Sequence, residues 1–367
     1  MAFTYELNNI HRDSDYFTGK IKKNSPVSEV FSALVKGESL EKWGKKADEA
    51  VAYIKTLGSR AENGDGQAIA ELNTLRRFVV EAPLLEEMRL LSIFGNYQAV
   101  GFDESIEREV WNYVGERSRT QAEGGDVVFP QISKTVYPVP TVTISGGYAV
   151  DYRRIANGDM SKENEGLEIV RTDIRNNAVR YVINKVYDAI HAATGVKYDL
   201  TAAGLTKAGV DDILTKVRRN GRPTVIGDYA ILSQFTPWAG YSGIIGGNTI
   251  NGISEKAMNE IAQNGLLGTY NGAILAEMPN PYNRYELNAA GDNYETLLPA
   301  GLAFVVPNGV QSPIATWTRG GLTSLTGNNI KTGKVETRFD LTVACDVAKG
   351  QEDKIGVIYD SNIGGLN

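Results

Sequence analysis

The sequence has very little cysteine and histidine. One cysteine, Cys345, and two histidines, His11 and His191, occur in 367 residues, and the two histidines stand far apart in the chain. A single cysteine excludes an internal disulfide framework, and two distant histidines offer little for a zinc site. We therefore expect no metal and no cofactor. Cys345 falls on the apolar side of a predicted strand, which favours a small buried hydrophobe over a nucleophile.

Long apolar runs and an excess of basic charge are also missing. The nearest approach to an apolar run, residues 84–94, contains Glu86, Glu87 and Arg89, so the sequence predicts no membrane-spanning helix. The N-terminus has no basic region followed by an apolar core, so we expect no signal peptide and a soluble chain made inside the cell. The 38 basic and 44 acidic residues give a net charge of −6, which excludes a strongly basic nucleic-acid-wrapping protein but allows local basic patches.

Two stretches of the sequence resemble catalytic or nucleotide-binding motifs, but each lacks a required residue or spacing. The stretch around Ser242 lacks the final glycine of a nucleophile elbow, because Ile244 stands there. Residues 327–334 imitate a phosphate-binding loop, but the glycine spacing is one residue too long and Val335 replaces the hydroxyl residue, so a hairpin turn is favoured. We expect no enzyme. The alternative is an α/β enzyme or ligand-binding protein with its site in the glycine-rich loop 240–252, near Tyr241.

The most distinctive segment is a predicted strand hairpin that runs into a very long helix. Residues 125–152 alternate polar and apolar side chains and are interrupted by Pro130, Pro138 and Pro140, which predicts a hairpin. An isolated two-stranded hairpin is marginal in water, so this one should gain its order from a neighbouring molecule. The helix is expected over 161–193, about 50 Å long. Its apolar residues recur every three or four positions: Leu167, Val170, Ile174, Ala178, Val182, Val186, Ala189 and Ala193.

Before this segment, the sequence predicts a helical region. Residues 1–25 are polar and irregular and are interpreted as a flexible arm. Three helices are expected, at 28–36, 40–57 and 67–82, with Pro83 ending or restarting the last. A further short helix is expected at 105–115.

After this segment, short strands alternate with helices, which indicates an α+β or α/β unit. Helices are expected at 207–220, 229–235 and 254–264, and strands at 222–226, 273–278 and 302–306. The clearest strand in the chain is 335–347, where apolar and polar residues alternate over about 40 Å. A second strand, 354–359, is expected to pair with it.

This order of elements resembles the major capsid protein of tailed bacteriophages. Two local stretches, Pro223–Asp228 and Ile274–Pro279, are similar to strand edges in the axial domain of that family. The resemblance covers residues 95–367 and implies an α+β protein with the HK97-like capsid fold. Its parts would be an N-terminal helical arm at 1–117, an extended E-loop hairpin at 118–158, a P-domain with the long spine helix at 159–206 and 333–367, and an A-domain at 207–332.

The resemblance also implies a function. A protein of this family self-assembles as pentamers and hexamers into an icosahedral shell that encloses double-stranded DNA, and it carries no catalytic residues. The implied location is the virion capsid, after assembly in the host cytoplasm. The implied partners are other copies of the chain, packaged DNA bound non-specifically on the inner face, and portal, scaffold or decoration proteins. An encapsulin-like nanocompartment shell is the alternative within the same fold.

Candidate inter-subunit contacts lie on and just after the predicted hairpin. A lysine there could form a crosslink with Asn362 of another subunit, although an ordinary surface lysine is favoured. A pair of arginines after the hairpin could meet phosphates or carboxylates, or face solvent. Residues 1–95 lie outside the matched part, and we expect them to be retained as an arm beneath a neighbouring subunit. The candidates are Phe129, Lys134, Tyr137, Ile144, Tyr148, Arg153 and Arg154.

Overall fold

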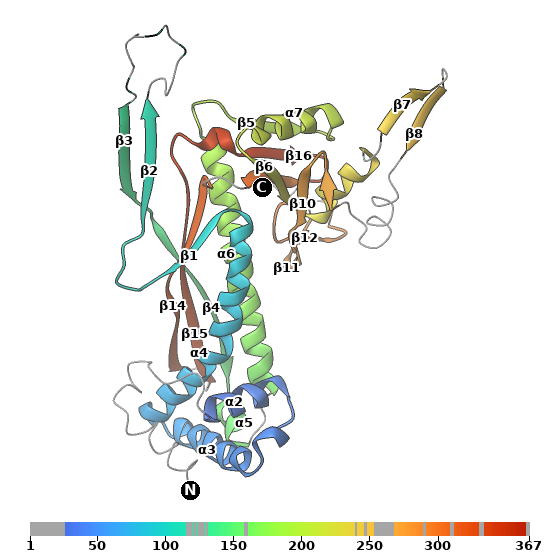
Figure 1. Cartoon of the computed structure of the whole chain (residues 1–367). Coiled ribbons are helices and arrows are strands. Elements are labelled where there is room, and N and C mark those ends of the chain that lie inside the picture. Colours follow the sequence, from blue (N-terminus) through green and yellow to red (C-terminus); the bar gives the residue numbers. More distant parts are fainter. Residues whose placement is uncertain are drawn as a thin grey trace.

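The protein is elongated around one long helix. The computed structural model describes residues 26–114, 120, 123, 129, 131–157, 161–238, 241–245, 248–252, 268–288, 291–308, 312–329 and 334–364. Figure 1 shows α6 (Ser161–His191) running beside a sheet of long strands, with N-terminal helices at one end and a compact sheet-and-helix unit at the other. The predicted α+β class and the predicted long helix at 161–193 are confirmed.

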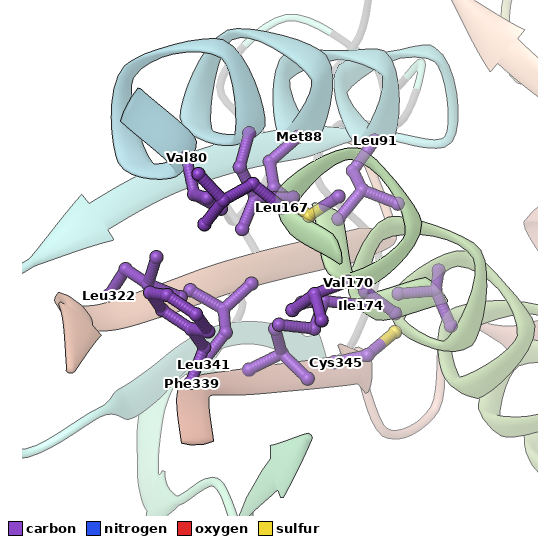
Figure 2. Packing of buried hydrophobic residues seen from close by; sticks show 14 of the residues in the cluster. Val80, Met88, Leu91, Leu167, Val170, Ile174, Leu322, Phe339, Leu341 and Cys345 are labelled. Carbon is purple, nitrogen blue, oxygen red and sulfur yellow. The ribbon is translucent and has the colours of Figure 1, made fainter. Parts of the chain in front are cut away.

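The long helix buries the stripe that its periodicity predicted. Leu167, Val170, Ile174, Ala178, Val182 and Val186 are all buried, and so are Ile183 and Ile190 on the same side. The structure thus gives the helix an apolar cover within the chain. That cover is made mainly by long strands and by the helix α4 described below (Figure 2).

The strands beside α6 form a four-stranded sheet. Its order is β1 (Asn96–Val100), β14 (Ile314–Asn329), β15 (Lys334–Val347) and β4 (Thr141–Val150), with β1 parallel to β14 and the others antiparallel. The predicted alternation in 335–347 is confirmed, because Phe339, Leu341 and Val343 are fully buried against the helices. Figure 2 shows this packing, in which β15 residues point toward α6.

The predicted partner of the long strand is wrong. The strand at 354–359 exists as β16 (Gly356–Asp360), but it pairs with β13 (Leu302–Asn308) and β5 (Tyr198–Ala202). Its consecutive residues Val357 and Ile358 are both buried, which requires a sheet covered on both faces. The sheet beside α6 provides such a place over only part of its length, because the outward residues Glu336, Arg338 and Asp340 of β15 are polar. The actual partners of β15 are β14 and β4.

Three N-terminal helices form the end of the molecule near the start of α6. The predicted helices are confirmed, with bounds α2 (Pro26–Lys36), α3 (Lys45–Glu62) and α4 (Gly66–Met88). Pro83 neither ends nor restarts α4, which runs through it. An interior proline costs about 3 kcal/mol. Leu84 and Met88 continue the buried face of α4 beyond Pro83, and their burial offsets that cost.

The compact unit at the other end contains a six-stranded sheet. The predicted strands at 222–226, 273–278 and 302–306 and the helix at 207–220 are confirmed. The sheet order is β5, β16, β13, β6 (Arg222–Gly227), β10 (Ala273–Glu277) and β9 (Thr269–Tyr270). Helices α7 (Lys207–Arg218) and α8 (Tyr229–Leu232) pack on it around their own apolar cluster. The helix predicted at 254–264 lies outside the described residues.

Three pairs of strands complete the part of the fold that the structure describes. The glycine-rich loop predicted at 240–252 forms the pair β7 (Tyr241–Ile245) and β8 (Asn248–Gly252), and a second pair is β11 (Tyr282–Leu287) with β12 (Tyr294–Thr296). The third is β2 (Glu107–Val114) with β3 (Gln131–Pro138). Short helical turns are α5 (Tyr152–Asn157), η2 (Glu41–Trp43), η3 (Arg89–Ile93), η4 (Ser233–Trp238) and η5 (Glu352–Lys354).

The hairpin predicted at 125–152 is wrong in its pairing, and the helix predicted at 105–115 is wrong in its type. Residues 107–114 form a strand that pairs with β3, whereas β4 joins the long sheet through ten residue pairs with β15. Pro138 ends β3 and Pro140 stands just before β4, so the two strands can enter different sheets. Val110, Trp111 and Val114 are strong strand formers, which explains the type of β2.

Two negative findings concern the described residues alone. Within them, no helix is long and apolar enough to cross a membrane. The same part of the chain holds no group of three or more histidine, cysteine, aspartate or glutamate side chains placed to bind a metal ion.

Candidate assembly surface

The β2–β3 hairpin extends away from the body of the protein (Figure 1). Its eight residue pairs run from Glu107 opposite Pro138 to Val114 opposite Gln131. In the described part of the chain, each of these two strands pairs only with the other. A two-stranded sheet of this kind depends on contacts beyond its own backbone.

The base of the hairpin is fastened to the long sheet by polar contacts. The Arg108 guanidinium donates hydrogen bonds to the carbonyl oxygens of Ser312 and Pro313, both at 3.1 Å. The Tyr137 hydroxyl donates to the Asp346 carboxylate at 2.8 Å. Burial, together with this carboxylate, raises the pKa of Tyr137 to about 12. Tyr137 therefore stays a neutral donor and holds β3 against β15.

Apolar packing supports the same base. Val110 on β2 is only 3% exposed. A small cluster beneath the hairpin joins the chain before β2 and after β3 to the long sheet, and it consists of Ile106, Val139, Ala315, Trp317 and Ala344. One side of the hairpin base is thus buried within the chain.

The other side of the hairpin is an exposed apolar face. Residues directly opposite each other in a sheet share a side, so Trp111, Ile132, Lys134 and Val136 lie on one face together with Glu109. The exposed fractions of Trp111, Ile132 and Val136 are 46%, 56% and 46%. The Lys134 ammonium pairs with Glu109 at 2.6 Å and lies 5.6 Å from the Trp111 ring centre. We call Trp111, Ile132 and Val136 the hairpin face.

The predicted contact residues on the hairpin differ in their surroundings. Phe129, in the connection between β2 and β3, is 85% exposed. Lys134 lies at the centre of the hairpin face. Tyr137 instead donates its hydroxyl hydrogen bond to Asp346 of the same chain. Phe129 and Lys134 are therefore the two predicted residues that extend the exposed surface.

Two further predicted contacts are partly buried against the main core. Ile144 sits on β4 opposite Leu341 and packs against the main core. The Tyr148 ring stacks on Phe339 with ring centres 6.3 Å apart, and its hydroxyl donates to Glu163 at 2.5 Å. These side chains stabilise the packing of β4 against α6.

The two arginines after the predicted hairpin lie elsewhere. Arg153 and Arg154 are exposed on α5, at the end of the molecule that holds the N-terminal helices. The Arg153 guanidinium donates to Glu62 on α3 at 3.1 Å. The seven predicted contact residues therefore do not form one surface.

Sequence reasoning missed the apolar residues of the hairpin face. A signal for Trp111 was present in Glu107–Val114, where charged residues come first and strand formers follow. Apolar residues at 110, 113 and 114 also fit helical spacing, so the local pattern does not exclude the helix that was wrongly predicted there. Pairing with β3, far along the chain, decided the outcome.

A known protein family matches nearly the whole chain. Residues 6–359 match the model of the family described as "SPbeta prophage-derived putative capsid protein YonB". No curated protein matches the sequence.

Solved structures of similar architecture include capsids of several origins. The capsid of cyanophage P-SCSP1u shares 9% identity with a TM-score of 0.45 over 72% of this chain and 86% of that chain. The head of Helicobacter pylori bacteriophage KHP40 shares 8% with a TM-score of 0.43 over 73% and 87%. The holo-SrpI encapsulin complex from Synechococcus elongatus PCC 7942 shares 12% with a TM-score of 0.44 over 76% and 89%.

The family match and the observed fold agree with the resemblance read from the sequence. The chain contains a projecting hairpin, a long helix beside long strands and a compact sheet-and-helix unit, as the HK97-like fold implies. The family model covers nearly the whole chain. The chain therefore belongs to the capsid protein family of the SPbeta prophage-derived protein YonB.

Proposed function

We propose that this protein is a major capsid protein whose copies assemble as pentamers and hexamers into an icosahedral shell around double-stranded DNA. The observation that carries the proposal is the hairpin face. Three large apolar side chains lie exposed on a two-stranded sheet that reaches away from the body of the subunit. Exposed apolar surface of this kind marks a protein interaction site, and a family of shell proteins makes another copy the natural partner.

The structure suggests a revised division of the chain into capsid domains. In our proposal the E-loop is 107–138 instead of 118–158, since β4 belongs to the long sheet. The P-domain comprises α6 and the four-stranded sheet, so it includes β14, which the sequence placed in the A-domain. The A-domain is the unit built on the six-stranded sheet. Helices α2, α3 and α4 are packed on the P-domain core.

The finer parts of the proposal concern partners and location. The shell assembles in the host cytoplasm and becomes the virion capsid. Local basic side chains on its inner face contact DNA phosphates without sequence preference. Such electrostatic contacts depend on the local charge and not on the net charge of the whole chain. Portal, scaffold or decoration proteins complete the particle. The subunit acts as a structural protein without catalysis.

Electron microscopy of the purified protein tests the proposal. We expect closed shells or rings in negative stain, and nuclease-resistant DNA in particles isolated from cells that produce the protein with its genetic neighbours. A monodisperse monomer at high concentration and under varied salt would contradict self-assembly. Shells that hold a protein cargo and no DNA would replace the virion proposal by the encapsulin-like alternative.

A further inference from the structure

Three arginines gather where α7 ends and β6 begins. Arg218 is the last residue of α7, Arg219 follows it, and Arg222 is the first residue of β6. All three are exposed, and residues 216–222 contain no acidic residue. In the part of the chain that the structure describes, none of the three forms an ion pair. We call these three residues the arginine end.

Two of these guanidiniums are held by the turn between β9 and β10. The Arg218 guanidinium donates to the carbonyl oxygen of Asn271, and the Arg222 guanidinium donates to that of Gly272, each at 3.1 Å. Gly272 has a φ of +80°, and a Cβ there would lie 3.2 Å from Arg218 Nη1, so this approach favours glycine. In these contacts each guanidinium uses one of its roughly five N–H donors. The arginines are therefore positioned but retain donors for a partner.

The pair of strands β11 and β12 has the opposite character. Residues 277–296 contain four acidic residues and one basic residue. Tyr282, Leu287 and Tyr294 are large and are 57%, 60% and 45% exposed. They share one face, because Leu287 lies opposite Tyr294, Tyr282 lies opposite Thr296, and positions 294 and 296 point to the same side of β12. We call β11 and β12 with these side chains the tyrosine hairpin.

The tyrosine hairpin is fixed at its base and at its tip. At the base, the Asn280 side chain donates to the Leu298 carbonyl oxygen at 2.9 Å and accepts from the Leu298 backbone N–H at 2.8 Å. At the tip, the Asn288 side-chain oxygen accepts from the backbone N–H groups of Asp292 and Asn293 at 3.1 and 3.3 Å. A surface held in one conformation loses less entropy on binding, so this hairpin is suited to bind a partner.

The two surfaces lie at opposite ends of the six-stranded sheet. β6 begins at Arg222 and runs parallel to β10, and Gly227 at its end lies opposite Glu277 at the end of β10. The turn of Asn271 and Gly272 precedes β10, whereas the tyrosine hairpin follows it. At ~3.3 Å per residue, the two ends of β6 are roughly 17 Å apart. Among the described residues, no ion pair joins the two surfaces within one subunit.

The chemistry of the two surfaces is complementary. A guanidinium binds carboxylates through paired N–H donors and stacks on aromatic rings, and the tyrosine hairpin offers both groups. A twofold axis through either surface would bring arginine to arginine or carboxylate to carboxylate, which is repulsive. Contact between unlike surfaces avoids this repulsion. Such a head-to-tail contact closes into a ring when the rotation between neighbours allows it.

We propose that the tyrosine hairpin of one copy binds the arginine end of the next copy, so that the compact units join head to tail in a ring. Arg219 and Arg222 pair with Glu286 and Glu295 of the next copy, and the tyrosine rings stack on the guanidiniums. This inference rests on the proposed function, because it names the surfaces that join neighbours within one pentamer or hexamer.

Charge reversal on each surface tests the proposal. Arg219→Glu with Arg222→Glu, and separately Glu286→Lys with Glu295→Lys, should each lower the fraction of protein in rings or shells at least tenfold. All four substitutions in one chain exchange the charges of the two surfaces and should restore assembly to within about twofold of the unsubstituted protein. Size-exclusion chromatography and negative stain measure the fractions. Restoration by the fourfold variant also shows that the substitutions do not act by unfolding the subunit.

A matched control separates this contact from net charge. Lys45→Glu with Lys55→Glu makes the same change in charge as the arginine variant, on exposed residues of α3, and should assemble normally. Equal loss in this control would overturn the proposal. Loss from the arginine variant alone would assign the arginines to another ligand, such as DNA phosphates, and would also overturn it. Normal assembly of both reversal variants would refute this inference alone, whereas an unsubstituted protein that stays monomeric would refute the proposed function as well.

Crosslinking distinguishes a head-to-tail contact from a twofold one. In a Cys345→Ser background, Arg219→Cys is combined with Glu295→Cys, and assembled protein is treated with a bismaleimide. We expect a ladder of covalent products that extends to five or six subunits, because each copy uses both surfaces. Each single-cysteine variant is the control and should give at most a trace of dimer. Products that stop at the dimer in the double variant would overturn the proposal.

Discussion

Arg76 on α4 and Glu163 on α6 form an ion pair that is closed to solvent, with each side chain about 1% exposed. The Arg76 guanidinium also donates to the Thr337 hydroxyl on β15 at 3.2 Å, and the Tyr148 hydroxyl of β4 donates to Glu163 at 2.5 Å. One buried network therefore joins two helices and two strands at the point where the N-terminal helices meet the long sheet.

Breaking this ion pair should be costly. Glu163→Gln leaves the Arg76 charge buried without its counter-charge, and we expect the free energy of unfolding to fall by about 3–5 kcal/mol. Urea denaturation of unassembled subunits measures the change. Glu62→Gln is the control, because it breaks the exposed Arg153–Glu62 pair and should cost about 0.5 kcal/mol or less. Equal losses in the two variants would contradict the burial of the network.

Gly166 should not tolerate a side chain, although it lies inside a helix. A Cβ there would stand 2.6 Å from Tyr148 Cδ2, so Gly166→Ala must displace the ring that donates to Glu163. Alanine favours a helix by about 1 kcal/mol over glycine, yet we expect a net loss of roughly 1–3 kcal/mol from overpacking. Thermal or urea unfolding provides the measurement. Gly66→Ala, in open space at the start of α4, serves as the control and should be neutral or stabilising.

Stability should decrease as the pH rises through neutrality because of Glu71. Burial raises the pKa of this carboxyl group from 4.5 to about 8 in the folded protein, where it accepts a hydrogen bond from Tyr53. The folded state therefore holds a proton that the unfolded state releases above pH 4.5. The resulting stability is fully present below pH 4.5 and is lost between that pH and about 8, at up to about 1.4 kcal/mol per pH unit.

The test of this pH dependence is the urea midpoint at pH 5 and pH 8. Glu71→Gln removes the titrating group and should make the two midpoints approach each other. If Glu71→Gln keeps the full difference between the urea midpoints at pH 5 and pH 8, other titrating groups cause that difference. Retained helical content in far-ultraviolet circular dichroism checks that the variant folds.

Charge on the hairpin face should block assembly without unfolding the subunit. Trp111→Glu with Ile132→Glu replaces two exposed residues, so stability should change by less than about 1 kcal/mol. Shell formation should be lost, because burying two unpaired carboxylates against a neighbour is costly. Size-exclusion chromatography and negative stain report the outcome. Val196→Glu alters a still more exposed apolar residue outside the hairpin and should still assemble; normal shells from the hairpin variant would refute the role of this face.

Elements with a long, regular pattern could be predicted from the sequence. The apolar stripe of α6 repeats from Leu167 to Ile190, and β15 alternates along most of its fourteen residues, so each pattern excludes the competing structure. The helices α2, α3 and α4 were found for the same reason. The one error concerned Pro83, which was expected to end or restart the last of these helices. The helix α4 continues through it, since burial of Leu84 and Met88 outweighs the lost backbone hydrogen bond.

Only part of the candidate assembly surface could be predicted from the sequence pattern. Phe129 and Lys134 were identified as contacts and are exposed or on the hairpin face. Ile144 and Tyr148 were chosen on the same grounds and are packed, partly buried, against the core. No local feature of β4 distinguishes a strand in a projecting hairpin from a strand paired with β15, because both alternate in the same way.

By itself, the sequence determined which segments are helices or strands where the period is long, and which face of each is apolar. It also determined the class of protein, since the order of elements and the family match concern the chain as a whole. Only the tertiary structure decided the partner of each strand. Strand pairing brings together residues far apart in the chain, such as Tyr148 and Thr337, and its energy depends on the packing of the whole sheet against α6.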